Sequence, residues 1–298
     1  MTTTVYPHEA DHELNAKSTC HEEILRCADQ IPPLPSSVLK VLEILDDPAS
    51  DAMELADAVS VDTNLTMALL KLACSPAYPK PNGIRSVAEA ITLVGLIQLR
   101  ALTLTTSLIG LAKCETVDHL VWENSVATAI IARRLAEEIV TQHPEEIFLM
   151  GLLHGLGQFA LLANPKTRLA YGRVLQRIQD SGVDYATAEL EVFGFSHNMI
   201  GALVAQRWNF SPELSETILH YADPVEPIVS HAGQKRLLVK LADLLAHAAF
   251  VGRPPGYPIQ LELIQQLSTV LGIKPAGDSS VVEMIVMARN ILQAKADF

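Results

Sequence analysis

The stretch that most constrains this chain runs from Ile147 to Ala163, IFLMGLLHGLGQFALLA. It contains no Asp, Glu, Lys or Arg, and a single histidine, His154, lies near its middle and is followed by Gly155 and Gly157. An uninterrupted apolar run of this length predicts a buried helix. The histidine at its centre indicates either a tolerated core residue or the floor of a chemical site, and the functional question is which of the two applies.

The composition favours a folded chain with an aliphatic core. Of the 298 residues, 49% are hydrophobic, 19% are charged and only 5% are aromatic, which provides enough apolar side chains to fill a sizeable core. The formal net charge is -12. Because an acidic surface repels phosphate backbones, direct binding of nucleic acid is not expected.

The cysteines and the N-terminus indicate a cytoplasmic protein. The four cysteines form no C-x-x-C pair, and the polar, acidic start lacks a signal-peptide pattern. Cys74 and Cys114 lie in apolar segments, so we expect both to be buried. The run 90–112 could mimic a membrane span, but Arg100 near its centre would cost about 2.5 kcal/mol or more in a bilayer. We therefore expect buried helices of a soluble protein there, with no membrane partner.

Periodicity predicts an all-α fold. Apolar residues recur at helical spacing along most of the chain, and proline, glycine and capping residues separate the segments. Ser86 and Glu89 fit a capping box at the start of the run 90–112, and Gly95 is expected to be a bend or a close-packing point in that run. We find no series of alternating strand segments. The fold class that follows is all-α.

Six stretches, met in order along the chain, resemble the HDOD family of helical signalling domains related to the HD phosphohydrolases. They cover about residues 31 to 225 and read IPPLPSSVLKVLEILDDP, VDTNLTMALLKLACSPAY, IRSVAEAITLVGLIQLRAL, WENSVATAIIARRLA, EEIFLMGLLHGLGQFAL, and FGFSHNMIGALVAQRWNFSPEL followed by ILHYADP. The resemblance implies a two-lobed HDOD fold with an N-terminal helical bundle and an HD-domain-like helical lobe.

The resemblance also implies a division of the chain. We expect a flexible tail over residues 1–25 and an HDOD domain over 26–225, with its N-terminal lobe at 26–115 and its degenerate HD-like lobe at 116–225. Residues 226–298 are expected to form C-terminal helices that complete the HD-like lobe. Because no room remains for an attached receiver or catalytic domain, we expect a protein that acts in trans.

Active HD enzymes hold metal ions through an early His, a His-Asp pair, a late Asp and, in the HD-GYP branch, further histidines. In the HD-GYP branch a lysine also follows the His-Asp pair. The resemblance implies that these positions fall on a vestigial site made of Asn124, His154, Gly155, Gln158, His197, His220 and Asp243. Glycine cannot replace the bridging aspartate, and an amide is a weaker ligand for transition metals than imidazole. We therefore expect no catalytic residues, no cofactor and a pseudoenzyme.

An alternative stays open for the remaining ligand types. His154, His197, His220 and Asp243 would suit a single Zn, Ni or Fe ion if they converged. Otherwise they are relic polar groups, with Asp243 facing a partner such as His154 and His220 partly exposed. We expect the second arrangement.

The predicted function is a non-catalytic bacterial signal-transduction or adaptor module that binds a partner protein or a small ligand. The expected partners are signalling proteins, for example members of a cyclic-di-GMP or two-component pathway, and a homodimer is a further candidate. The alternatives are a residual metal-dependent phosphohydrolase acting on cyclic dinucleotides or nucleotides, and a regulator that contacts nucleic acid.

Overall fold

A computed structural model describes residues 35–74, 78, 83–111, 116–139, 144–208, 210–225, 231–273 and 281–293. Every regular element in these ranges is an α-helix, which confirms the predicted all-α class. The predicted tail at 1–25 and Cys114 lie outside the described residues.

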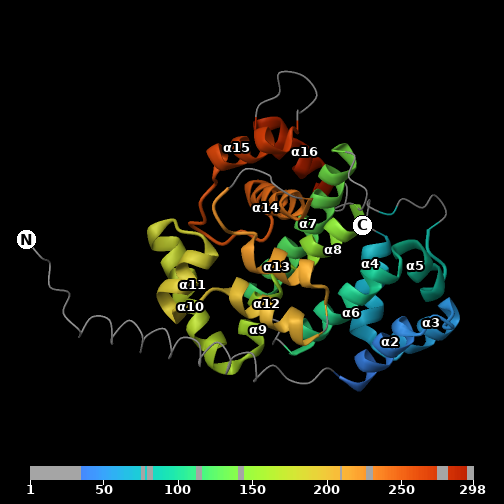
Figure 1. The fold of residues 1–298 in the computed structure, drawn as a ribbon. Coiled ribbons are helices and arrows are strands. Elements are labelled where there is room, and N and C mark those ends of the chain that lie inside the picture. The colour runs from blue at the N-terminus through green and yellow to red at the C-terminus, as the bar shows by residue number, and fades with distance from the viewer. Residues whose placement is uncertain are drawn as a thin grey trace, which may run out of the picture.

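The helices form two groups that share one hydrophobic core (Figure 1). The N-terminal group comprises α2 (Ser36–Asp46), α3 (Ala52–Ser60), α4 (Thr63–Ala73), α5 (Val87–Val94) and α6 (Leu96–Leu111). The second group begins with α7 (Thr116–Glu138), α8 (Pro144–Leu153), α9 (Leu156–Ala163), α10 (Pro165–Ser181), α11 (Tyr185–Phe193), α12 (His197–Arg207) and α13 (Pro212–His220). It ends with α14 (His231–Ala248), α15 (Leu261–Leu271) and α16 (Val281–Gln293).

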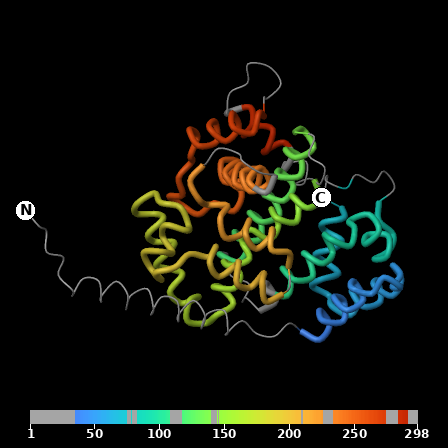
Figure 2. The backbone as a smooth tube through the Cα atoms, viewed as in Figure 1, coloured from blue at the N-terminus to red at the C-terminus, as the bar shows by residue number. Residues whose placement is uncertain are grey.

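Helix α7 organises the second group because it packs against both α8 and α14. Helix α12 packs between α9 and α13, and α6 joins the two groups through contacts with α8 and α9. In the backbone trace the yellow α10–α11 pair lies on the side away from the N-terminal helices (Figure 2). The predicted site positions Asn124, His154 and Asp243 therefore come from α7 and from elements packed against it.

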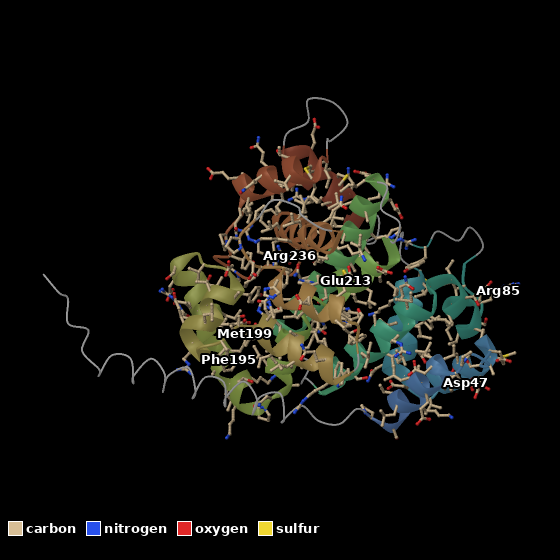
Figure 3. The ribbon with its side chains drawn as sticks, viewed as in Figure 1. Asp47, Arg85, Phe195, Met199, Glu213 and Arg236 are labelled. Atoms are coloured by element: carbon tan, nitrogen blue, oxygen red, sulfur yellow. The ribbon has the colours of Figure 1, made fainter. Side chains whose placement is uncertain are left out.

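Local sequence signals explain the helix boundaries in the N-terminal group. The side chain of Asp51 accepts hydrogen bonds from two amides of the first turn of α3, and that of Asp62 does the same for α4. The Ser86 hydroxyl accepts from the Glu89 amide at 3.1 Å, and the Glu89 carboxylate accepts from the amide of Arg85 at 2.7 Å. Charged side chains such as Asp47 and Arg85 lie at the outer edge of this group (Figure 3).

The run 90–112 bends as predicted. Gly95 adopts φ 90°, a conformation that favours glycine, and α5 and α6 meet there at an angle of 110°. In the part of the chain that the structure describes, one stretch, Glu146–Ala163, is long and apolar enough to cross a membrane, and 83% of it is buried inside the fold.

Two expectations need correction. Cys74 is exposed, not buried, because it lies at the C-terminal end of α4, whose apolar face is formed by Leu65, Leu69 and Leu72. The apolar stretch from Ile147 is not one continuous helix, since a turn at His154 and Gly155 separates α8 from α9. The His154 ring donates from Nδ1 to the carbonyl of Gly151 at 2.6 Å. In a continuous helix the same carbonyl would accept from the amide of Gly155, so the two donors compete for it.

Candidate functional site

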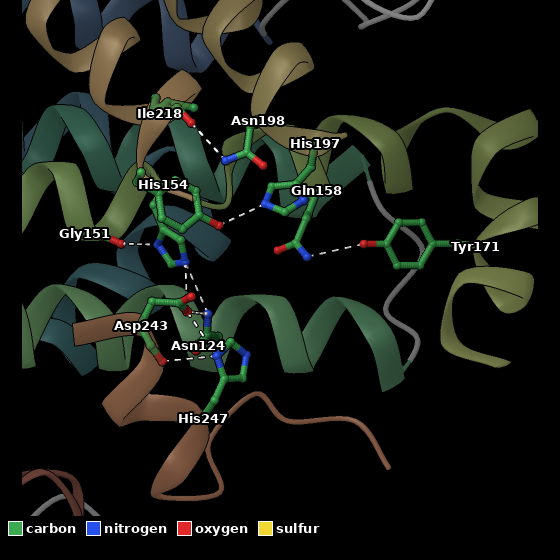
Figure 4. A network of polar contacts seen from close by, with 11 residues as sticks. Asn124, Gly151, His154, Gln158, Tyr171, His197, Asn198, Ile218, Asp243 and His247 are labelled. Atoms are coloured by element: carbon green, nitrogen blue, oxygen red, sulfur yellow. Dashed lines mark hydrogen bonds and ion pairs between the residues drawn. The ribbon is translucent and has the colours of Figure 1, made fainter. Parts of the chain in front are cut away.

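Asn124, His154 and Asp243 meet at the centre of the second helical group (Figure 4). Helix α7 carries Asn124, the turn after α8 carries His154, and α14 carries Asp243. All three side chains are buried, with exposed fractions of 6%, 2% and 8%. The packing of α7 against both α8 and α14 therefore brings together three positions that are far apart in the sequence.

The Asn124 side-chain amide contacts both His154 and Asp243. Its Nδ2 donates to Asp243 Oδ1 at 2.7 Å and lies 3.2 Å from His154 Nε2. Because His154 Nδ1 faces a backbone carbonyl, it carries a ring hydrogen, and Nε2 accepts from Asn124. His154 Nε2 lies 3.4 Å from Asp243 Oδ1, so the predicted pairing of Asp243 with His154 is present.

His247 completes this network from one turn further along α14. Its Nδ1 lies 3.1 Å from the Asp243 carbonyl oxygen and 3.2 Å from Asp243 Oδ1. Burial alone would raise the pKa of the Asp243 carboxyl, but the charge of His247 and a hydrogen bond from its ring outweigh burial and hold that pKa well below its ordinary value. Asp243 is therefore a carboxylate at neutral pH.

His197 belongs to a second, adjoining network built on Glu189. Glu189 is fully buried and accepts at Oε2 from the His197 amide at 2.7 Å and from His197 Nδ1 at 2.6 Å. At Oε1 it accepts from the Tyr171 hydroxyl at 2.7 Å. The glutamate thus binds the first amide of α12, whereas the Ser196 side chain makes no capping bond there.

Both nitrogens of the His197 ring are engaged, since Nε2 lies 3.0 Å from the Tyr221 hydroxyl. Burial would lower the pKa of His197, but the Glu189 carboxylate raises it above its ordinary value. Gln158 lies beside this network, where its amide nitrogen donates to the Tyr171 hydroxyl at 3.4 Å. Gln158 therefore bonds to another side chain of the fold.

Two of the predicted positions contribute no ligand group to this centre. His220 pairs through Nδ1 with Asp223 at 2.8 Å, and its side chain is 40% exposed. At Gly155 an added Cβ would lie 3.1 Å from the Ser125 hydroxyl, so the space beside this glycine is closely lined. The structure thus brings His154, Asp243 and Asn124 together and leaves His220 outside.

The residues do not fit a metal ion. The Asn124 Nδ2 group, a donor with no free lone pair, occupies the space between His154 Nε2 and Asp243 Oδ1. His197 uses both ring nitrogens, and His220 lies apart. Among the described residues, no group of three or more His, Cys, Asp or Glu is placed to hold a metal.

A cavity of about 80 Å³ adjoins both networks. Its lining includes four of the predicted site positions, Asn124, Gln158, His197 and Asp243, together with Tyr221. Further lining residues include Asp184 and Tyr185 at the start of α11, Lys240 and His247 of α14, and Tyr257 in the loop after α14.

The loop after α14 packs closely over this region. The ring of Tyr257 stacks on His247 with centroids 4.3 Å apart. Gly252 adopts φ 63°, and an added Cβ there would lie 2.3 Å from Asn124 Cβ. The loop therefore needs glycine at this point because a side chain would strike α7.

Sequence reasoning missed Glu189 and His247 as members of the site. The i, i+4 spacing of Asp243 and His247 on one helix could have revealed the second. No comparable signal marks Glu189, whose neighbours become clear only when α10, α11 and α12 pack together.

Comparisons with known proteins agree on one family. Residues 31–224 match the family model for the HDOD domain. A solved HDOD domain protein with unknown function from Geobacter sulfurreducens is 24% identical, with a TM-score of 0.69, covering 95% of this chain and 97% of that one. A Shewanella amazonensis protein, provisionally named a phosphohydrolase, is 23% identical, with a TM-score of 0.65, covering 91% and 95%. At these identities the likeness shows a shared fold.

A longer relative also matches. An uncharacterized protein of Treponema pallidum is 25% identical over 228 residues, which cover 72% of this chain and 43% of that protein. This chain thus spans less than half the length of that curated relative.

Proposed function

This chain belongs to the HDOD domain family, which is related to the HD phosphohydrolases, and on that premise we propose that it is a non-catalytic signalling module that works by binding. It recognises a signalling protein or a small ligand and does not hydrolyse phosphate esters. We propose the same division of the chain as above, with residues 226–298 as part of the HD-like lobe.

The observation that carries this proposal is the position of the Asn124 amide. A metal ion binds histidine and carboxylate through their lone pairs, but here the same lone pairs of His154 and Asp243 face an amide nitrogen. A metal-activated water and neutralised phosphate charge are the main contributions of ions to phosphoester hydrolysis. Because these side chains do not have the geometry to bind an ion, they supply neither an activated water nor neutralisation of the phosphate charge.

The other departures support the same function. Gly155 offers no bridging carboxylate, and the Gln158 amide bonds to Tyr171. The Glu189–His197–Tyr221 contacts connect α11, α12 and α13 around the cavity. In the proposed mechanism, occupation of this lobe shifts its packing against α6, which joins it to the N-terminal helices.

Turnover assays test this proposal. The full chain is assayed with Mn²⁺, Fe²⁺ or Ni²⁺ against cyclic di-GMP and a generic phosphodiester, beside an Asp243→Asn variant purified in the same way. We expect the two proteins to give the same background rate. Metal-dependent turnover that the Asp243→Asn change abolishes would contradict the proposal.

A further inference from the structure

Phe250 adopts a strained backbone conformation at the C-terminal end of α14. Among the residues that the structure describes, it is the only one other than glycine with a positive φ, 67°. The Val251 amide donates to the Ala246 carbonyl at 3.0 Å, and the Phe250 amide donates to the carbonyl three residues before it at 3.1 Å. This is the pattern of a Schellman motif, in which the left-handed position is usually glycine. A side chain at this position destabilises the backbone, and the helix ending itself does not require phenylalanine.

The Phe250 ring is held at the surface by two arginines. Phe250 is 64% exposed, and the guanidinium groups of Arg253 and Arg289 lie 4.9 Å and 5.5 Å from its ring centroid. Arg253 is itself fixed, because its Nε and Nη2 donate to the Tyr257 carbonyl at 3.1 Å and 2.8 Å. Val286 is exposed and lies three residues before Arg289 on α16, so these two side chains are neighbours. We call Phe250, Arg253, Val286 and Arg289 the Phe250 patch.

The Phe250 patch has the composition of a protein-binding surface. Aromatic residues and arginine are enriched among the residues that dominate the binding energy of protein interfaces, and a ring that is already fixed loses little conformational freedom on binding. Neither arginine forms an ion pair with a carboxylate of the described residues. Their charge is therefore available in a chain whose formal net charge is -12. The patch fits an acidic surface that also carries exposed apolar side chains.

Helix α3 presents such a surface in the N-terminal group. Residues 43–62 contain seven acidic residues and no Lys or Arg. Met53 and Val61 are 67% and 76% exposed, and Asp57, which is also exposed, lies four residues from each, so the three share one side of the helix. Glu54 is exposed three residues before Asp57, and neither carboxylate has an ion-pair partner among the described residues. We call Met53, Glu54, Asp57 and Val61 the α3 stripe.

The Phe250 patch and the α3 stripe do not meet within one chain. Helix α3 packs against α2, α4 and α5, whereas α16 packs against α7, α14 and α15. The two helices lie at different ends of the molecule, with the blue α3 at the outer edge of the N-terminal group and the red α16 at the top of the second group (Figure 1). Contact between two such different surfaces joins copies head to tail.

We propose that the Phe250 patch of one copy of this chain binds the α3 stripe of a second copy. In this contact the Phe250 ring packs against Met53 and Val61, and Arg289 pairs with Asp57. The contact offsets the strain and exposure of Phe250, which stabilise nothing within a single chain. Interfaces that bury less than about 1,200 Å² are weak and transient, so association through these few side chains depends on concentration. The inference goes beyond the proposed function because it uses no residue of the vestigial site.

Sedimentation velocity of the full, untagged chain tests this inference over a concentration series that reaches about 0.5 mM. We expect the weight-average mass to rise with concentration above that of a monomer. The rise should become smaller as NaCl is increased from about 0.05 M to 0.5 M, because salt screens the charges of Arg289 and Asp57.

Four variants assign the two surfaces. Phe250→Gly should abolish association and keep the wild-type midpoint of urea unfolding, because glycine suits the left-handed position. Arg289→Glu and Asp57→Arg should each weaken association about 10-fold or more, because each places like charges opposite one another. The double variant Arg289→Glu with Asp57→Arg restores opposite charges across the contact and should recover association.

Two controls change α10 instead, where Arg173→Glu reverses an exposed charge and Leu169→Ala shortens an exposed apolar side chain. Both should associate as the wild type does. The inference is overturned by a chain that stays monomeric throughout the series, by association that survives Phe250→Gly, or by a double variant that associates no better than its single parents. Loss of association in Arg173→Glu would also overturn it, because the effect would then come from net charge alone.

Discussion

Replacing Asn124 by alanine removes the group that connects His154 with Asp243. A hydrogen bond to a charged group contributes about 1.5–3 kcal/mol and one between neutral groups about 0.5–1.5 kcal/mol, so the bonds to Asp243 and His154 together contribute roughly 2–4.5 kcal/mol. The change also removes the unpaired Oδ1, which returns about 1 kcal/mol. The expected net loss in the free energy of unfolding is about 1–3.5 kcal/mol.

Asn198 provides a matched control. It is also buried, its amide nitrogen donates to the Ile218 carbonyl at 3.1 Å, and its Oδ1 has no hydrogen-bond partner among the described residues. For Asn198→Ala the lost neutral bond and the removed unpaired oxygen nearly cancel. Urea unfolding at pH 7 should therefore place Asn124→Ala about 2 kcal/mol below Asn198→Ala, since only Asn124 bonds to a carboxylate. Equal stability of the two variants would refute the bridging role of Asn124.

Two further predictions concern packing and pH. Gly157→Ala should prevent stable folding or lower the free energy of unfolding by more than about 4 kcal/mol, because the new Cβ would lie 1.8 Å from the His197 carbonyl oxygen. The control Gly172→Ala, whose new Cβ would have no neighbour within 4 Å, should raise the free energy of unfolding by about 0.5–1 kcal/mol through the higher helix propensity of alanine in α10. The pKa of Asp243 is lowered in the folded chain. Its ionised carboxylate therefore contributes fully to the free energy of unfolding at pH values above the unfolded-state pKa, about 3.9, and this contribution is lost as the pH falls through the folded-state pKa. The difference in the free energy of unfolding between wild type and Asp243→Asn, measured by urea unfolding from pH 6 to pH 3, should become smaller as the pH falls. A difference that stays constant would contradict the contacts assigned to Asp243, and a Gly157→Ala variant as stable as wild type would contradict the close contact at Gly157.

The fold and part of the site could be predicted because they depend on local pattern and motif order. Helical periodicity indicated the all-α class, and Gly95 marked the bend between α5 and α6. The pairing of Asp243 with His154 followed from the order of the family's ligand positions. These features need no knowledge of how distant helices pack.

Other features depend on tertiary contacts and were not predictable. The enclosure of His197 by Glu189 and Tyr221 is one of them, whereas the partial exposure of His220 beside Asp223 agrees with the expectation. The break between α8 and α9 coincides with a side-chain bond of His154 to its own helix. Apolar periodicity carries no signal for either effect.

The effect of metal on stability tests the central claim most directly. An ion that bound the folded chain at 100 times its Kd would raise the free energy of unfolding by about 2.7 kcal/mol. Urea unfolding of the untagged wild-type chain with 1 mM Mn²⁺ or Ni²⁺, compared with 1 mM EDTA, should give the same midpoint, because the Asn124 amide occupies the position between His154 and Asp243. A rise of about 2–3 kcal/mol that disappears in Asp243→Asn would show a functioning metal centre and contradict the account.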